Sequence, residues 1–268
     1  TKSLPRHRKA FLSSREHVLG HYRNFSKLAD NLETARYFEF GAGWDLLNNL
    51  LLYCFGLNDQ LVVDVKPLAR PEYINAAIKS IRENTIDEFK RVPEKFVDRD
   101  FVEELEEIYG IKYRAPADAR KLPVADASID LVATTSTLEH IPPPELRRII
   151  KELYRVCHDN SVVSMKISYN DHYAHGDSSI TPYNYFKYSR FHWALLNPGI
   201  HYQNRLREVD FKKFFADAEF DLIEESAIIP ENARDLLDRV IIHKDFEKYE
   251  TEDLLKTYGN LVYMKAAN

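Results

Sequence analysis

The sequence lacks the features that mark disulfide-linked, zinc-finger and membrane-spanning proteins. Its 268 residues include two cysteines, Cys54 and Cys157, which lie far apart without a Cys-x-x-Cys pair or cysteine–histidine ligand spacing. This usage favours a reducing cytoplasm with two ordinary thiols. No apolar run reaches the length of about twenty residues that spans a bilayer. The basic residues 1–9 are not followed by the apolar block of a signal peptide, so we expect a solvated tail there.

An excess of positive charge is also missing, since the net charge is −5 at pH 7. General nucleic-acid binding relies on surplus lysine and arginine, so nucleic acid is not an expected partner. With 44% hydrophobic and 29% charged residues, the chain has the composition of a soluble globular protein. We expect a single domain over residues 1–268 that carries insertions.

Residues 37–45, YFEFGAGWD, are the stretch around which the chain is organised. An apolar run ends at two glycines and then turns into a helical pattern, which is typical of a strand, a tight turn and a helix. Gly41 and Gly43 tolerate positive φ and close backbone approach, so the helix that follows can point its free N–H groups at a ligand. The third glycine of a dinucleotide fingerprint and the Lys-Ser/Thr of a P-loop are absent. The pattern predicts a nucleotide-cofactor loop.

Further motifs follow this loop in a recognisable order. Asp64 ends the next apolar run about twenty residues downstream, where a carboxylate can take both ribose hydroxyls. Residues 117–132, ADARKLPVADASIDLV, and residues 134–142, TTSTLEHIP, come next. Together with the acidic-x-Gly-x-Gly loop, these motifs resemble those of the class I S-adenosylmethionine-dependent methyltransferases, which have a Rossmann-like fold.

The resemblance covers about residues 35–168 and implies both a fold and a cofactor. We expect an α/β protein with a mostly parallel seven-stranded sheet, helices on both faces, and helical and aromatic insertions. The last strand, residues 261–265, would be antiparallel. Glu39 would orient the loop and the methionine end of S-adenosylmethionine, Asp64 would bind the ribose, and Asp118 would accept from the adenine amino group. The residues predicted to bind the cofactor are Glu39, Gly41, Ala42, Gly43, Asp64, Asp118, Ala119, Thr135 and Ser136.

Three segments lie outside these motifs. Residues 1–34 carry apolar positions at helical spacing and should form an N-terminal helical segment. Residues 66–110 are longer than a plain helical connection needs, which indicates a helical insertion. It either borders the substrate site or forms a dimer surface, so a homo-oligomer stays open. Residues 169–207 follow the fifth strand, where the fold family commonly carries its substrate-recognition insertion.

Histidines are the candidates for acid–base chemistry. Methyl transfer to oxygen requires the acceptor hydroxyl to lose its proton, and the ordinary pKa of histidine suits that task. His140 follows the fourth predicted strand, while His172 and His175 follow the fifth beside Asp171 and Asp177. We expect the base among these histidines, with His172 and His175 favoured. The residues from Asp171 to Asp177 could instead bind Mg²⁺, which lowers the pKa of a hydroxyl, although their spacing is not specific.

Aromatic side chains crowd residues 169–193. Such rings stack on sugar faces and offer hydroxyls to polar edges, which favours a saccharide acceptor, yet they equally suit the packing of an insertion. The residues predicted to contact the acceptor are Tyr169, Asp171, Tyr173, Tyr185, Trp193 and Arg205. This stretch is loosely similar to methyltransferases encoded with bacterial surface-glycan assembly.

The resulting hypothesis is a cytoplasmic S-adenosylmethionine-dependent O-methyltransferase that acts on a saccharide, a glycan terminus or a similar polar small molecule. Two alternatives stay open. Methylation of nitrogen or carbon in a small metabolite would need no strong base and would leave His172 and His175 expendable. A catalytically silent member of the fold would serve as a binding or scaffolding protein.

Overall fold

The computed structural model of the protein describes residues 4–29, 31–197, 199 and 202–266. Parts of the predicted segments 1–34 and 169–207 therefore lie outside the described residues. The chain folds around a seven-stranded sheet with the order β3-β2-β1-β4-β5-β7-β6. This confirms the predicted α/β architecture. No helix in the described part of the chain combines the length and the apolar character needed to cross a membrane.

The antiparallel strand predicted over residues 261–265 lies within the last of the seven strands. The strands are β1 (Arg36–Phe40), β2 (Asp59–Val63), β3 (Ile111–Arg114), β4 (Ile129–Thr135), β5 (Cys157–Ser168), β6 (Phe220–Ile228) and β7 (Tyr258–Lys265). The pairs within β1 to β5 are all parallel, whereas β7 is antiparallel to both β5 and β6. The carboxyl ends of β1, β2, β4 and β5 consequently meet at one edge of the sheet, where α/β folds bind ligands.

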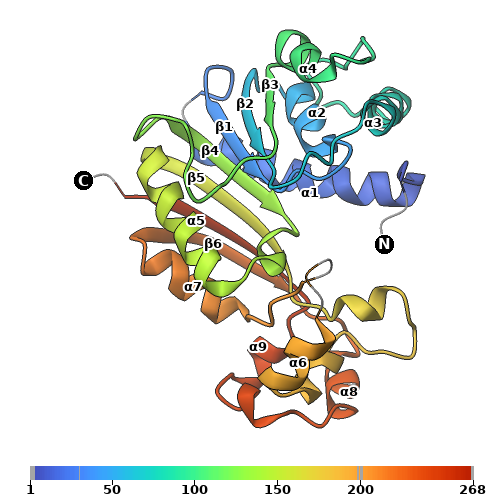
Figure 1. The fold of residues 1–268 in the computed structure, drawn as a ribbon, viewed down its shortest axis with the longest axis vertical. Coiled ribbons are helices and arrows are strands. Elements are labelled where there is room, and N and C mark those ends of the chain that lie inside the picture. The colour runs from blue at the N-terminus through green and yellow to red at the C-terminus, as the bar shows by residue number, and fades with distance from the viewer. Residues whose placement is uncertain (1–3, 30, 198, 200–201, 267–268) are drawn as a thin grey trace.

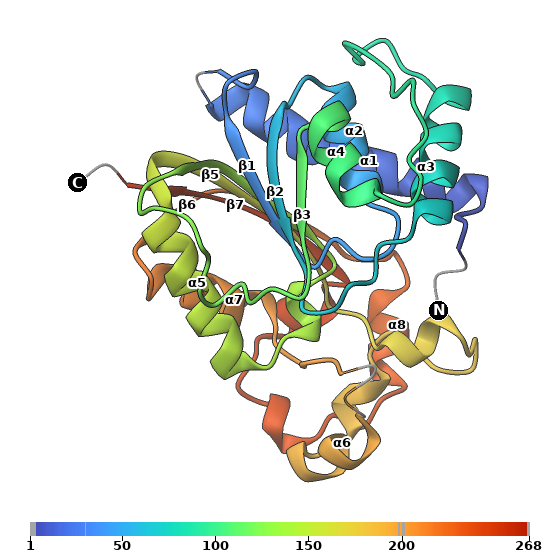
Figure 2. The same ribbon diagram turned by 45° about the horizontal axis from the view of Figure 1, so that its top comes forward.

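Helices cover both faces of the sheet (Figures 1 and 2). One face carries α1 (Arg8–Leu28), α2 (Leu47–Cys54), α3 (Pro71–Glu83) and α4 (Phe101–Tyr109), and the other carries α5 (Pro143–Val156) and α7 (Glu208–Ala216). Each packs through the apolar stripe that its sequence repeats at helical spacing, as Leu146, Ile150 and Leu153 do in α5. The two resulting cores hold the sheet between them.

Beyond the carboxyl edge of the sheet lies a small helical lobe (Figure 1). Its elements are η2 (His172–His175), η3 (Asn184–Lys187), α6 (Arg190–Leu196), α8 (Ala233–Asp238), η4 (Lys244–Phe246) and α9 (Thr251–Leu255). The stretch of residues 169–193 has no clear period in the sequence, and it forms short helices held by aromatic packing. The lobe core contains Tyr183, Tyr185, Phe186, Trp193, Leu237, Phe246 and Leu254. It therefore joins the insertion after β5 to the charged segment before β7.

Arg207 ties this lobe to the sheet. Its side chain is fully buried just before α7. One guanidinium nitrogen donates to the Tyr169 backbone oxygen at 3.1 Å and to the Tyr185 hydroxyl at 3.0 Å. The other donates to the backbone oxygens of Asp253 and Lys256 at 2.6 and 2.7 Å. The guanidinium thus replaces the water that these oxygens lose when the lobe folds against β5 and β7.

Replacing Arg207 with methionine should lower the free energy of unfolding by more than about 3 kcal/mol, because several buried oxygens lose their donor at once. The control is Arg148→Met. Arg148 is exposed in α5 and pairs with Glu145, so its loss should cost less than about 1 kcal/mol. Urea denaturation of both variants checks the difference. Equal midpoints for the two variants would contradict the role assigned to Arg207.

Candidate functional site

The glycine loop lies at the carboxyl end of β1. Gly41 and Gly43 have φ of +75° and +77°, which is the left-handed region that favours glycine. The Gly41 N–H donates to the Val63 oxygen at 2.9 Å, so the loop starts against the end of β2. A Cβ on Gly41 would lie 2.5 Å from Cγ2 of Thr137, which follows β4. The loop therefore touches the ends of two neighbouring strands, with Ala42 partly buried against the core of the α1–α4 face.

Asp64 joins the glycine loop to the third strand. Its carboxylate accepts from the Gly43 N–H at 3.3 Å and from the Lys66 N–H at 3.2 Å. Its backbone oxygen accepts from the Ala117 N–H at 2.8 Å, which brings in the segment after β3. Burial raises the pKa of Asp64, while these backbone hydrogen bonds oppose the rise. The structure thus gathers the predicted loop, the predicted ribose carboxylate and the predicted adenine segment at one place.

Glu39 is buried inside β1 and connects that strand to α2. Its carboxylate accepts from the Tyr37 hydroxyl at 3.0 Å and from the side-chain amides of Asn48 and Asn49 at 3.0 and 2.9 Å. Burial raises the pKa of Glu39 to about 7, although the three donors pull it down. Its described contacts hold the start of α2, so it orients the loop through the helix that the loop enters.

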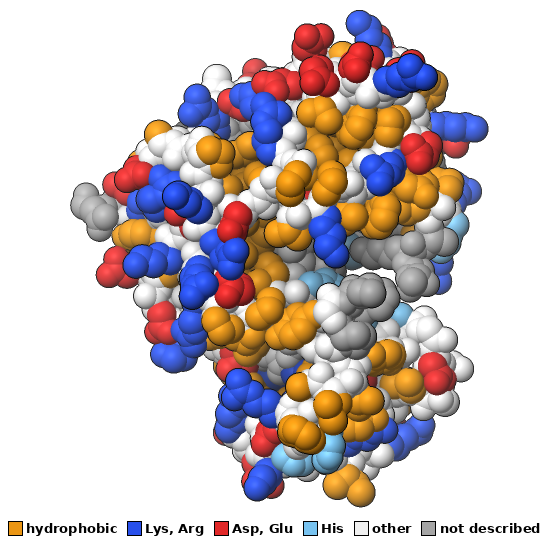
Figure 3. Space-filling model, viewed as in Figure 1, with side chains coloured by type: hydrophobic (Ala, Val, Ile, Leu, Met, Phe, Trp, Pro, Cys, Tyr) orange, Lys and Arg blue, Asp and Glu red, His pale blue; other side chains and the backbone are white. Residues whose placement is uncertain are grey.

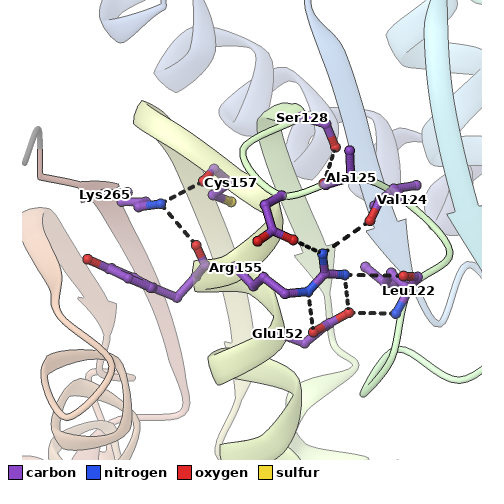
Figure 4. A network of polar contacts seen from close by, with 10 residues as sticks. Leu122, Val124, Ala125, Ser128, Glu152, Arg155, Cys157 and Lys265 are labelled. Atoms are coloured by element: carbon purple, nitrogen blue, oxygen red, sulfur yellow. Dashed lines mark hydrogen bonds and ion pairs between the residues drawn. The ribbon is translucent and has the colours of Figure 1, made fainter.

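Helix α5 hydrogen-bonds to the chain that follows Asp118, at residues 122–124. Figure 4 shows the Arg155 guanidinium donating to the Val124 and Leu122 oxygens at 3.1 and 3.2 Å and pairing with Glu152. These contacts fix the Leu-Pro bend that leads into β4. Asp118 itself is exposed and pairs with Arg120, whose hydrogen bond lowers the pKa of Asp118. Its neighbour Ala119 is buried.

Helix α1 reaches the same edge through His21. The two ring nitrogens of His21 bond to the Ser164 hydroxyl at 2.7 Å and to the Thr135 hydroxyl at 3.0 Å. Burial lowers the pKa of His21 to about 3, so the ring is neutral at physiological pH. Thr135, predicted to contact the cofactor, is therefore engaged with α1, and the next residue, Ser136, has a left-handed φ of +53°.

Three histidine rings form a row at this edge, and we call them the histidine row. His140 ends η1 (Leu138–His140) after β4, and His172 and His175 bound η2 after β5. The ring centroids of His140 and His172 lie 4.9 Å apart, and those of His172 and His175 lie 5.1 Å apart. The structure brings together all the histidines proposed as bases. Figure 3 shows histidine side chains beside the notch between the sheet and the lobe.

Glu139, which the sequence motifs do not single out, joins this row. One ligand atom each of Glu139, His140 and His172 lies within 4.8 Å of the others. The signal that could have found it is the Glu-His pair directly after β4.

Two of the residues predicted from the sequence as possible Mg²⁺ ligands, Asp171 and Asp177, accept hydrogen bonds from neighbouring residues. Buried Asp171 accepts from the Tyr173 N–H at 2.9 Å and from the Asn184 amide at 3.1 Å. Exposed Asp177 accepts from Ser179, and of the predicted set His172 alone belongs to the group found among the described residues.

Most residues predicted to contact an acceptor are packed inside the protein. The side chains of Tyr169, Tyr185 and Trp193 are buried, and Arg205 donates to the Tyr185 backbone oxygen at 3.1 Å. These groups hold the lobe together in this conformation. Tyr173 is 48% exposed and retains a ring face for stacking.

A comparison with family models gives one match relevant to this site. Residues 84–165 match the model described as a methyltransferase domain. That span includes the Asp118 segment, β4 and η1. Together with the fold, the match indicates a methyltransferase. No curated protein matches the sequence.

Solved structures share the fold at low sequence identity. An S-adenosylmethionine-dependent methyltransferase from Methanosarcina mazei has 14% identity and a TM-score of 0.52, with 91% of this chain and 97% of that chain covered. A chain from the complex of the Haloferax volcanii Trm112 methyltransferase activator has 14% identity, a TM-score of 0.51, and coverages of 97% and 94%. The [4+2]-cyclase SpnF has 14% identity, a TM-score of 0.53, and coverages of 96% and 82%.

Replacing Gly41 with alanine should destabilise the protein by about 1–3 kcal/mol, because it combines left-handed backbone strain with a clash against Thr137. Gly20→Ala is the matched control. Gly20 lies inside α1, and a Cβ added there would meet no atom within 4 Å, so alanine should stabilise that helix by up to about 1 kcal/mol. Urea denaturation measures both changes. Equal effects of the same sign would show that the loop does not constrain residue 41.

Glu39 should also make stability depend on pH. The folded protein holds the Glu39 proton up to a pKa of about 7, whereas the unfolded chain releases it near 4.5. Protonated Glu39 therefore contributes about 3 kcal/mol to the free energy of unfolding below pH 4.5. This contribution is lost as the pH rises to 7. Glu39→Gln should lose less stability than the wild type over this window. Denaturant midpoints from pH 5 to 8 measure the difference, and parallel curves for the two proteins would refute the assignment.

Proposed function

We propose that this methyltransferase transfers the methyl group of S-adenosylmethionine to a hydroxyl of a saccharide, a glycan terminus or a similar polar small molecule. The sulfonium donor is already activated, so the protein mainly has to align the acceptor with the methyl group and help the hydroxyl lose its proton. The observation that carries this proposal is that the cofactor residues and the histidine row share one edge of the sheet.

The cofactor half is supported by hydrogen bonds that the loop, β2 and the segment after β3 make with one another. We propose that Asp64 binds the ribose hydroxyls, because its buried carboxylate faces the backbone of Gly43. We further propose that Gly41 and Gly43 let the methionine part approach the backbone, and that Asp118 turns from Arg120 toward the adenine amino group. Ala42, Ala119, Thr135 and Ser136 would complete the wall.

The acceptor half is supported by the histidine row. Imidazole nitrogens can take a proton from a hydroxyl, and the row lies between the sheet and the lobe, where an acceptor can enter. We propose Tyr173 as the aromatic platform, since its ring is partly exposed and stands edge-on to Trp193 at 6.3 Å between centroids. Buried Tyr169, Tyr185 and Trp193, together with the half-buried Arg205, would then support the acceptor site from behind.

The alternatives predict different behaviour of the same residues. Methylation at nitrogen or carbon would survive the loss of His172 and His175, whereas hydroxyl methylation should not. The similarity to a [4+2]-cyclase is a likeness of fold, so methyl transfer has to be measured directly. The similarity to a chain from a complex with an activator makes a protein partner worth testing by co-expression.

Asp64→Asn should weaken S-adenosylmethionine binding about 10- to 100-fold, because the ribose loses hydrogen bonds to a charged acceptor. The matched control is Asp59→Asn at the opposite end of the same strand, where Asp59 pairs with Lys112. Calorimetric titration with S-adenosylmethionine and S-adenosylhomocysteine measures both variants. We expect the control to bind like the wild type.

Two outcomes would overturn the proposed cofactor site. If the wild type binds neither compound, the proposed methyltransferase activity is refuted. If both aspartate variants bind equally well, the cofactor does not use the carboxyl end of β2.

A further inference from the structure

Glu139, His140 and His172 form a compact group of metal-ligating side chains, and the proposed methyl transfer gives no role to Glu139. Glu139 and His140 are adjacent in η1, and His172 begins η2. Their ligand atoms lie within 4.8 Å of one another. Atoms that are each about 2.1 Å from one ion lie about 3.4 Å apart in a tetrahedron, so ligand atoms near the 4.8 Å limit have to close by more than an ångström. Binding therefore requires rotations of the ligand side chains.

The ring of His140 is held in the state that a metal needs. Its Nδ1 lies 2.8 Å from the backbone oxygen of Tyr202. A carbonyl oxygen only accepts hydrogen bonds, so Nδ1 carries the proton and Nε2 keeps its lone pair. Metal-ligating histidines characteristically donate their second nitrogen to such an oxygen, which fixes the tautomer and the ring orientation.

The backbone around the ligands is fixed by the segment of residues 202–204, which we call the strap. The Asn204 N–H donates to the Glu139 oxygen at 2.7 Å, and the Asn204 side chain donates to the Leu138 and Ile141 oxygens at 2.8 and 2.9 Å. The Gln203 side-chain oxygen accepts from the His172 N–H at 3.2 Å. One segment thus positions η1 and the start of η2 together.

The burial of the three side chains also suits the binding of an ion. The Glu139 residue is 1% exposed, His172 is half-buried and His140 is exposed. The group is therefore closed on one side and open on the other, which leaves coordination positions for water or an acceptor.

We infer that Glu139, His140 and His172 bind a divalent transition-metal ion at the mouth of the acceptor site. Two imidazoles and one carboxylate suit Zn²⁺, Co²⁺, Mn²⁺ or Fe²⁺, whereas Mg²⁺ prefers oxygen ligands in an octahedron. The proposed site differs from the Mg²⁺ site predicted from the sequence in both its ion and its ligands. If the proposed function holds, the open positions would take the acceptor hydroxyl, the ion would lower the pKa of that hydroxyl, and His175, which is not a ligand, would take its proton.

The test is a Co²⁺ titration of the full chain after treatment with a chelator, because Co²⁺ bound by nitrogen and oxygen absorbs visible light. We expect one Co²⁺ per chain, displaced by Zn²⁺ and not by Mg²⁺. His140→Gln and His172→Gln should each weaken Co²⁺ binding by more than about tenfold. His158→Gln is the control, since His158 lies at the opposite end of β5 and pairs with Asp130.

The outcomes separate this inference from the proposed function. Equal Co²⁺ binding by His140→Gln and the wild type overturns the site, and so does an absence of visible absorption in the folded wild type. Because His140 is exposed, its variant should fold even where His172→Gln does not, and thermal melting of each checks this. Co²⁺ binding without S-adenosylmethionine binding supports the site and refutes the methyltransferase. S-adenosylmethionine binding without Co²⁺ binding supports the methyltransferase and refutes the metal site.

Discussion

Parallel strands that share a direction must end at the same edge of a sheet, and the rest of this structure depends on that constraint. It places the glycine loop after β1, Asp64 after β2, η1 after β4 and η2 after β5 side by side, although they span more than a hundred residues of sequence. Short backbone hydrogen bonds then fix their spacing, as between Gly41 and Val63 or between Ala117 and Asp64. The strand order therefore brings these segments to one edge, and hydrogen bonds then set the distances between them.

The glycine loop and the place of Asp64 at the end of β2 could be predicted from the sequence because their determinants are local. A positive φ at Gly41 and Gly43 and a carboxylate at the end of β2 each leave a mark within a few residues. The aromatic stretch was ambiguous for a physical reason: a ring that stacks on a sugar and a ring that fills a core are the same residue type. Tyr185 and Trp193 are buried in the lobe core, and only the tertiary structure reveals which surface they meet.

The grouping of Glu139 with His172 could not be found from the sequence for a different reason. Its partner His172 lies in another segment, and the contact that aligns them comes from the strap, whose side chains carry no motif. Gln203 and Asn204 are ordinary amides in the sequence, yet their hydrogen bonds join η1 to the start of η2. Such a constellation is invisible to spacing rules, because it requires three segments to be placed before any pair of ligands comes together.

The strap also connects the buried Arg207 to the site at the carboxyl edge of the sheet. Arg207 follows the strap by three residues and anchors it between β5, η3 and the end of α9. A segment fixed at that end can hold η1 and His172 in register, whereas a free loop would let the ligands separate. Because the lobe has its own aromatic core, its outer surface can change without disturbing the sheet, while the strap and Arg207 keep the acceptor side aligned with the cofactor side. Under the proposed function, the lobe is therefore the part of the protein in which acceptor specificity can vary.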